Sequence, residues 1–219
     1  AGASRDGRLS WDLSYAAGTG PWFAADRMPI GHLGWERMSW LVAMPRAEVT
    51  GRWIVDGRSY VVHGSGYHDH NWGEWLPADA LWNWAQFSDR GVDFEMGDFI
   101  GQPAGLVAIE CEGRRTVFTR DQVRLVHTRW ARDAENGGFY PVESRLWADD
   151  GTRRLRLTLR AVDTVPLRGD LPAPLRSLVL YEQTALFDGR LLERDAQGVW
   201  RVAARLRGGG FKEYTARRF

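Results

Sequence analysis

Short runs of alternating apolar and polar residues recur along the chain, and an Asp-Gly pair separates several of them. Such pairs stand at Asp56-Gly57, Asp150-Gly151 and Asp188-Gly189, each between two apolar runs. Glycine accepts a positive φ without strain, so Asp-Gly between two strands favours the tight turn of an antiparallel hairpin. The pattern therefore predicts a succession of β-hairpins with turns at these three places.

Residues 154–160 give the clearest strand, because three leucines alternate there with arginines and a threonine. Successive side chains of a strand point to opposite faces, so the leucines face the core and the arginines form a solvated face. Residues 164–177 hold three prolines and predict a loop. No segment shows a sustained helical period. About a dozen short strands joined by hairpins predict an all-β barrel or sandwich.

Composition narrows the possible functions. The 219 residues, 44% of them hydrophobic, suffice for one large domain or two small ones. With 29 basic and 28 acidic residues, the chain lacks the basic excess of a protein that binds nucleic acid through phosphates. No apolar run approaches the ~20 residues that span a bilayer. The single cysteine, Cys111, excludes an internal disulfide, and the cytoplasm is the expected compartment.

The segment richest in candidate chemistry is GSGYHDHNWG, residues 64–73, directly after the predicted strand Ser59–His63. If this strand continues, Tyr67, Asp69 and Asn71 project to one side of it. His68, His70 and Trp72 then project to the other side. The flanking glycines would let the backbone bend or let a ligand approach closely.

The stretch from Ala47 to Gly73, A-x-V-x-G-x-W-x-V-x-G-x-x-Y-x-V-x-G-x-G-Y-H-D-H-N-W-G, resembles the carotenoid hydratase (hydroxyneurosporene synthase) superfamily. That group is similar to tocopherol cyclase, kievitone hydratase and the fungal decalin-forming Diels–Alderases. Weaker matches follow in the expected order at Gly138–Pro141, Tyr181-Glu182 and Gly210–Thr215. The resemblance thus covers about residues 10–215.

The resemblance implies two lipocalin-like (calycin) antiparallel barrels in tandem, with a pocket in or between them. Residues 1–75 would be the C-terminal part of the first barrel, ending in the motif, and residues 76–219 the second barrel. Nothing in the chain matches the Glu-Trp-Trp-Tyr-like strand near the start of other members. Either the first barrel is incomplete here, or residues upstream are absent.

The resemblance also implies chemistry on carbon–carbon double bonds without a redox cofactor. It assigns the role of proton donor to Asp69, and we place Tyr67 and His68 beside it as catalytic residues. A carboxyl group in an apolar pocket is more readily kept protonated, because desolvation disfavours the charged form. Aromatic faces would stabilise the resulting cation. The expected substrate-binding residues, drawn from the motif and from the 12 tryptophans, are His70, Asn71, Trp72, Trp40, Trp53, Trp82 and Trp84.

Three readings remain open for this site. The first is an acid-assisted hydratase or cyclase acting on a hydrophobic polyene, isoprenoid or polyketide. The second is a pericyclase that works by folding its substrate, and the third is a lipocalin-type carrier in which Asp69 only ties the barrel together.

The spacing His68-x-His70-x-x-x-Glu74 is similar to the first metal motif of cupins, but the second cupin motif is absent. We therefore expect neither a metal nor a cofactor, and a hydrophobic small molecule as the partner.

Overall fold

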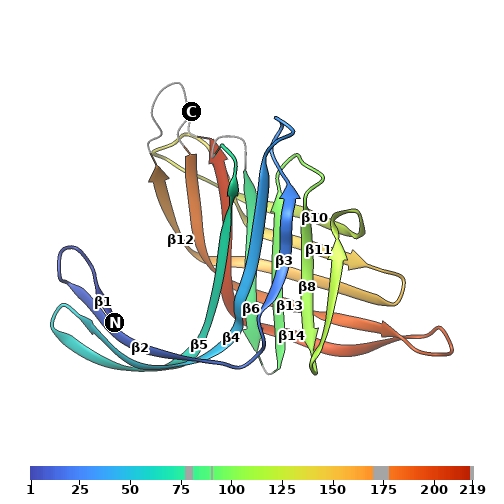
Figure 1. Cartoon of the computed structure of the whole chain (residues 1–219), viewed down its shortest axis with the longest axis horizontal. Helices are drawn as coiled ribbons and strands as arrows, with labels where there is room; N and C mark the ends of the chain where they lie inside the picture. The colour runs from blue at the N-terminus through green and yellow to red at the C-terminus, as the bar shows by residue number, and fades with distance from the viewer. Residues whose placement is uncertain (77–80, 90, 170–177, 218–219) are drawn as a thin grey trace. The chain divides into compact units, whose positions relative to one another are not determined.

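The computed structural model describes residues 1–76, 81–89, 91–169 and 178–217 (Figure 1). Its internal contacts divide the chain into two compact units. Unit 1 comprises Ala1–Asp26 and Ser39–Trp72, and unit 2 comprises Arg27–Met38 and Gly73–Phe219. Among the described residues, no helix is long and apolar enough to cross a membrane. The assignment of residues 1–75 to the end of one barrel and 76–219 to another stays a prediction.

Unit 1 is built on a five-stranded sheet with the order β1-β2-β4-β3, in which β5 also pairs with β4. The strands are β1 (Gly2–Ala3), β2 (Leu9–Ala17), β3 (Trp22–Pro29), β4 (Arg37–Val55) and β5 (Arg58–Glu74). The last residues of β3 and β5 and the first residues of β4 are assigned to unit 2. The predicted strand Ser59–His63 thus continues through the motif, which forms the second half of the long strand β5.

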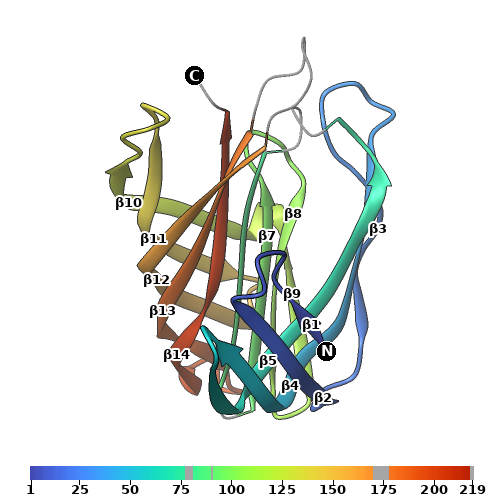
Figure 2. The ribbon, with the colours of Figure 1, turned by 90° about the vertical axis from the view of Figure 1, so that its left-hand side faces the viewer.

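Unit 2 contains a nine-stranded sheet in which each strand pairs with its neighbour in sequence, from β6 to β9 and from β10 to β14. The last strand returns to the first, because β14 pairs antiparallel with β6. The sheet's two edges, β9 and β10, are consecutive in sequence and joined by one short turn, η1. The sheet therefore curls into a barrel with a single break, and Figure 2 shows β10–β14 side by side in its wall. The elements are β6 (Trp82–Asp89), β7 (Val92–Phe99), β8 (Gly105–Cys111), β9 (Arg114–Thr119), η1 (Arg120–Gln122), β10 (Val123–Arg132), β11 (Phe139–Asp149), β12 (Arg153–Gly169), β13 (Leu178–Arg194) and β14 (Trp200–Arg217).

The hydrophobic core fills the inside of this barrel. Phe87 and Phe187 stack with their ring centroids 5.4 Å apart, and Phe94 and Phe118 are buried with them. The predicted alternation in residues 154–160 is confirmed, since the three leucines of that segment are at most 3% exposed. The fold is all-β, antiparallel and lipocalin-like, as expected. Within the described residues the one helical element is the three-residue η1.

Two of the three predicted Asp-Gly turns are confirmed. Asp56 and Gly57 have φ values of 47° and 78° and join β4 directly to β5, as a tight primed turn requires. Gly151, with φ 86°, lies in the turn between β11 and β12. The prediction of a turn at Asp188-Gly189 is wrong, because both residues lie inside β13 and the chain reverses after Arg194. A Cβ on Gly189 would lie 2.1 Å from the carbonyl oxygen of Arg156, so this glycine permits close strand packing instead.

The predicted loop over residues 164–177 is also wrong in its first part. Strand β12 continues to Gly169, and Pro166 lies opposite Tyr181 in the β12–β13 ladder. Residues 170–177 lie outside the described part of the chain. Antiparallel pairing with β13 has therefore overridden the local turn signal of this proline.

The glycines of the motif give a test of packing in unit 1. A Cβ on Gly66 would lie 2.6 Å from both the Tyr15 ring and a Val49 methyl group, whereas a Cβ on Gly64 would meet no atom within 4 Å. We expect Gly66→Ala to lower the free energy of unfolding by about 1–3 kcal/mol through overpacking. Gly64→Ala, the matched control, should stay within about 0.5 kcal/mol of the parent. Chemical denaturation measures both, and equal stability of the two variants would contradict the packing seen at Gly66.

Candidate functional site

A polar cluster in unit 1 is centred on Asp69. The indole Nε1 of Trp40 donates a hydrogen bond of 2.8 Å to Asp69 Oδ2, and the Tyr67 hydroxyl donates one of 3.1 Å to the same oxygen. Trp40 comes from β4, where it is only 2% exposed, while Tyr67 and Asp69 are half-buried on the paired strand β5. Of the predicted site residues, these three are brought together on one carboxylate oxygen.

The other motif side chains point away from this cluster. Alternation along β5 places His68, His70 and Trp72 on the opposite face from Tyr67 and Asp69, and all three are exposed. The rings of His70 and Trp72 stack with centroids 5.4 Å apart, and Phe23 meets Trp72 edge-on at 6.2 Å. Strand β5 therefore presents a carboxylate on one face and an aromatic group on the other.

The remaining predicted residues are dispersed. Asn71 is exposed, and Trp53 is 45% exposed on β4, opposite Trp11 of β2. Trp82 and Trp84 belong to unit 2, where both are half-buried on β6. The structure thus divides the predicted set between the two units.

A pair of carboxyl groups on neighbouring strands includes one that is bonded to Trp82. Glu182 of β13 lies directly opposite Glu213 of β14, and their side chains are hydrogen-bonded to each other. The indole Nε1 of Trp82 donates a hydrogen bond of 2.8 Å to Glu213 Oε2. A hydrogen bond between two carboxyl groups needs a proton on one of them. Burial raises the pKa of Glu182, although its hydrogen bond to Glu213 lowers it.

The barrel of unit 2 encloses a buried lysine and a half-buried histidine. Lys212, the only lysine in the chain, is 4% exposed and donates a hydrogen bond of 2.9 Å to the Pro141 carbonyl oxygen. Burial lowers its pKa to about 8. His127 Nδ1 lies 2.8 Å from the hydroxyl oxygen of buried Ser144. Burial first, and then the charge of Lys212, lower the pKa of His127 to about 4, so the imidazole is neutral at pH 7.

No role was predicted for Glu182, Glu213 or Lys212, although all three lie in stretches that carry the family resemblance. One signal was available for Lys212. Leu206, Gly208, Gly210 and Lys212 follow one another at every second position of β14, so a lysine stands on the inward face of a strand. The pairing of Glu182 with Glu213 depends on strand register, which local sequence does not reveal.

Metal binding was not expected, and the structure gives no candidate for it in the part of the chain that it describes. Within those residues, no group of three or more His, Cys, Asp or Glu side chains could hold a metal ion. His68 and His70 differ in surroundings, since only His70 stacks on Trp72.

Known proteins resemble this chain in fold but not closely in sequence. No protein-family profile and no curated protein matches it. Solved structures with the same fold include the AttH-type protein of Nitrosomonas europaea, with TM-score 0.72, 18% identity, and coverage of 97% of this chain and 66% of that one. They also include CghA with Sch210972, at TM-score 0.63 and 14% identity over 98% of this chain and 63% of that one. CghA alone gives TM-score 0.64 and 14% identity over 99% and 64%. The chain therefore spans less than two thirds of the length of these proteins.

The half-buried imidazole of His127 predicts a specific pH dependence of stability. The unfolded chain binds a proton at His127 below about pH 6.5, whereas the folded chain does so only near pH 4. Stability is therefore lost as pH falls from about 6.5 towards 4, by about 2 kcal/mol after discounting for partial exposure. We expect His127→Gln to remove this component, so that the parent-minus-variant difference in unfolding free energy shrinks with falling pH. A difference that stays constant over this range, measured by urea denaturation, would show that the ring is not held neutral.

Proposed function

We propose that this chain is a cofactor-independent enzyme that acts on a hydrophobic polyene, isoprenoid or polyketide. The reaction is acid-assisted addition to a carbon–carbon double bond, giving hydration or cyclisation, with Asp69 as the proton donor. The observation that carries the proposal is the asymmetry of this carboxyl group. The Trp40 indole and the Tyr67 hydroxyl both donate to the same oxygen, Oδ2.

This asymmetry suits proton donation. When Asp69 is protonated, Oδ2 still accepts from Trp40 and Tyr67, so the proton sits on Oδ1 and is directed away from these donors. After transfer to an alkene carbon, the same two donors stabilise the carboxylate that remains. Hydrogen bonds to an ionised acceptor are about twice as strong as neutral ones, so they favour the product of the transfer step.

The carbocation formed by protonation needs an electron-rich neighbour. The half-buried ring of Tyr67, whose hydroxyl is bonded to Asp69, can supply about 0.5–2 kcal/mol by cation–π attraction. Water adding to the cation gives a hydratase, and an internal alkene or hydroxyl gives a cyclase. The group formed by Phe23, His70 and Trp72 lies on the other face of β5, where we propose that it binds an apolar portion of substrate.

The carboxyl pair Glu182–Glu213 is a second candidate for the proton donor. Burial raises the pKa of Glu182, and the Trp82 indole donates a hydrogen bond to Glu213. Substituting Asp69 and Glu182 in separate variants shows which of the two is the proton donor, because each variant keeps the other acid.

A pericyclase is the second candidate function. Asp69 already accepts two hydrogen bonds, and in a pericyclase it would serve as a hydrogen-bond acceptor rather than as an acid. Holding the reacting ends of a polyene together lowers the barrier by several kcal/mol without any proton transfer. The resemblance of the motif to decalin-forming Diels–Alderases and the shared fold of CghA with Sch210972 support a site for a folded organic molecule. A carrier without chemistry needs the same kind of pocket.

The decisive experiment follows product mass in D₂O, with purified protein and an organic extract of the source organism. Proton-initiated chemistry puts deuterium on carbon, and Asp69→Asn should reduce its rate by about 10²–10⁴-fold because the acid is lost. Tyr67→Phe should reduce the rate by about tenfold, since one donor to the carboxylate is removed. Asp12→Asn, an exposed change on β2, is the matched control and should leave the rate unchanged.

Other outcomes would reassign the function. Full turnover by Asp69→Asn with loss in Glu182→Gln would transfer the proton donor to unit 2. An isomer without deuterium would identify a pericyclase, and a ligand recovered unchanged would identify a carrier.

A further inference from the structure

The outer wall of the unit 2 barrel carries a row of arginines in direct register. Across three neighbouring strands, Arg156 of β12 lies opposite Arg190 of β13, and Arg190 lies opposite Arg205 of β14. All three side chains are exposed and alternate with buried leucines that face the core. The sequence predicted a solvated face for the arginines of residues 154–160. The pairing register of β12, β13 and β14 places one arginine from each strand side by side on that face.

The row beside it is also polar. Arg145 of β11 lies opposite Thr158 of β12, Thr158 lies opposite Asp188 of β13, and Asp188 lies opposite Arg207 of β14. Together the two rows hold five arginines and one carboxylate. Their strong positive charge contrasts with the net charge of +1 for the whole chain.

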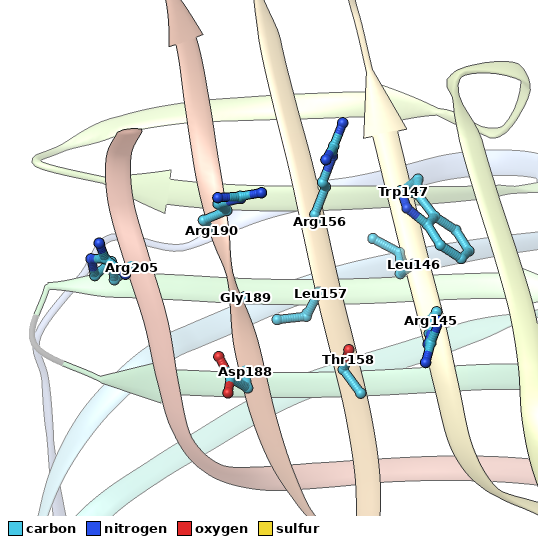
Figure 3. Close-up of a pocket in the computed structure, with 10 residues that line it drawn as sticks. All are labelled: Arg145, Leu146, Trp147, Arg156, Leu157, Thr158, Asp188, Gly189, Arg190 and Arg205. Atoms are coloured by element: carbon cyan, nitrogen blue, oxygen red, sulfur yellow. The ribbon is translucent and has the colours of Figure 1, made fainter. Parts of the chain in front are cut away.

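These rows enclose a shallow cavity of about 390 Å³. Figure 3 shows Arg145, Arg156, Arg190 and Arg205 around it, with Thr158 and Asp188 beside each other at one side. Gly189 has no side chain, and Leu157 completes the lining between the arginines. The surface is thus a concave, cationic depression rather than a flat sheet face.

Arginines elsewhere on the same face are neutralised by acidic partners. Arg154 pairs with Asp149, and Arg160 pairs with Glu143. In contrast, Arg145, Arg156, Arg190 and Arg205 form no ion pair with any residue that the structure describes. Like charges directly opposite each other on neighbouring strands are destabilising, so the empty cavity carries an unfavourable charge arrangement that a bound anion would relieve.

We propose that this arginine cavity, lined by Arg145, Arg156, Arg190 and Arg205, binds a small ligand with two or more phosphate groups. Neighbouring strands lie about 4.8 Å apart, so one phosphate can bridge two adjacent arginines, and a row of three engages more than one phosphate. The guanidinium fork matches phosphate oxygens bidentately. Thr158 and Asp188 would then hydrogen-bond to ligand hydroxyl groups. A site of this size and concavity favours a small polyanion over a nucleic acid strand or a membrane surface.

The test uses tripolyphosphate as the probe, titrated into the full chain by calorimetry at constant ionic strength. We expect saturable binding with one site per chain. The Arg156→Gln, Arg190→Gln double variant should bind about 100-fold more weakly, at about tenfold per charge-assisted contact, and Arg205→Gln about tenfold more weakly. Arg160→Gln is the matched control, because Arg160 is on the same strand and face but is already paired with Glu143. It should bind as the parent does.

Three results would overturn the proposal. No saturable binding of tripolyphosphate in the millimolar range would exclude the site. Equal weakening in Arg160→Gln and Arg156→Gln would show diffuse attraction to a basic face. Binding to phosphatidylglycerol vesicles without binding to tripolyphosphate would identify a membrane-docking surface instead. None of these results bears on the reaction proposed for Asp69, which is in the other unit.

Discussion

The return of β14 to β6 is the contact on which the architecture of unit 2 depends. The register joins Gly210 to Phe87 and ends at Tyr214 and Asn83, a short ladder of five residue pairs. A Cβ on Gly210 would lie 2.3 Å from the Gln86 carbonyl oxygen, so only glycine permits the two backbones to approach this closely. Because Gly210 has no side chain, the Phe87 and Phe187 rings have room to stack in the core. The closure of the barrel and the packing of its core therefore have the same steric origin.

Closure also decides which chemistry faces inward. Two residues beyond Gly210, strand alternation directs Lys212 into the barrel, where it meets the Pro141 carbonyl oxygen of β11 across the interior. The next residue, Glu213, is directed to the other face and joins Glu182 and Trp82. A low-dielectric interior favours the neutral form of the amine, and burial lowers the pKa of Lys212 to about 8. One strand thus separates a buried base from an acid pair.

Local sequence predicted the presence of strands better than the positions at which they end. Asp56-Gly57 forms the expected turn because both residues accept a positive φ. The same dipeptide at Asp188-Gly189 lies within β13, since pairing on both sides outweighs the local turn preference. Pro166 likewise stays in a strand because its ladder continues beyond it. The motif around Asp69 was recognised from residue types alone, and its alternation correctly separated Tyr67 and Asp69 from the histidines.

By itself, the sequence determined the all-β class, the alternation of faces and the segment that holds the candidate carboxylate, because each depends on neighbours within a few residues. Tertiary structure decided what those residues meet. The Trp40 bond to Asp69 and the contact of Glu182 with Glu213 join positions about 30 residues apart in sequence. The arginine row also depends on the register of separate hairpins. A shift of one residue in register would direct each of these side chains to the opposite face, and only packing of the assembled sheets fixes that register.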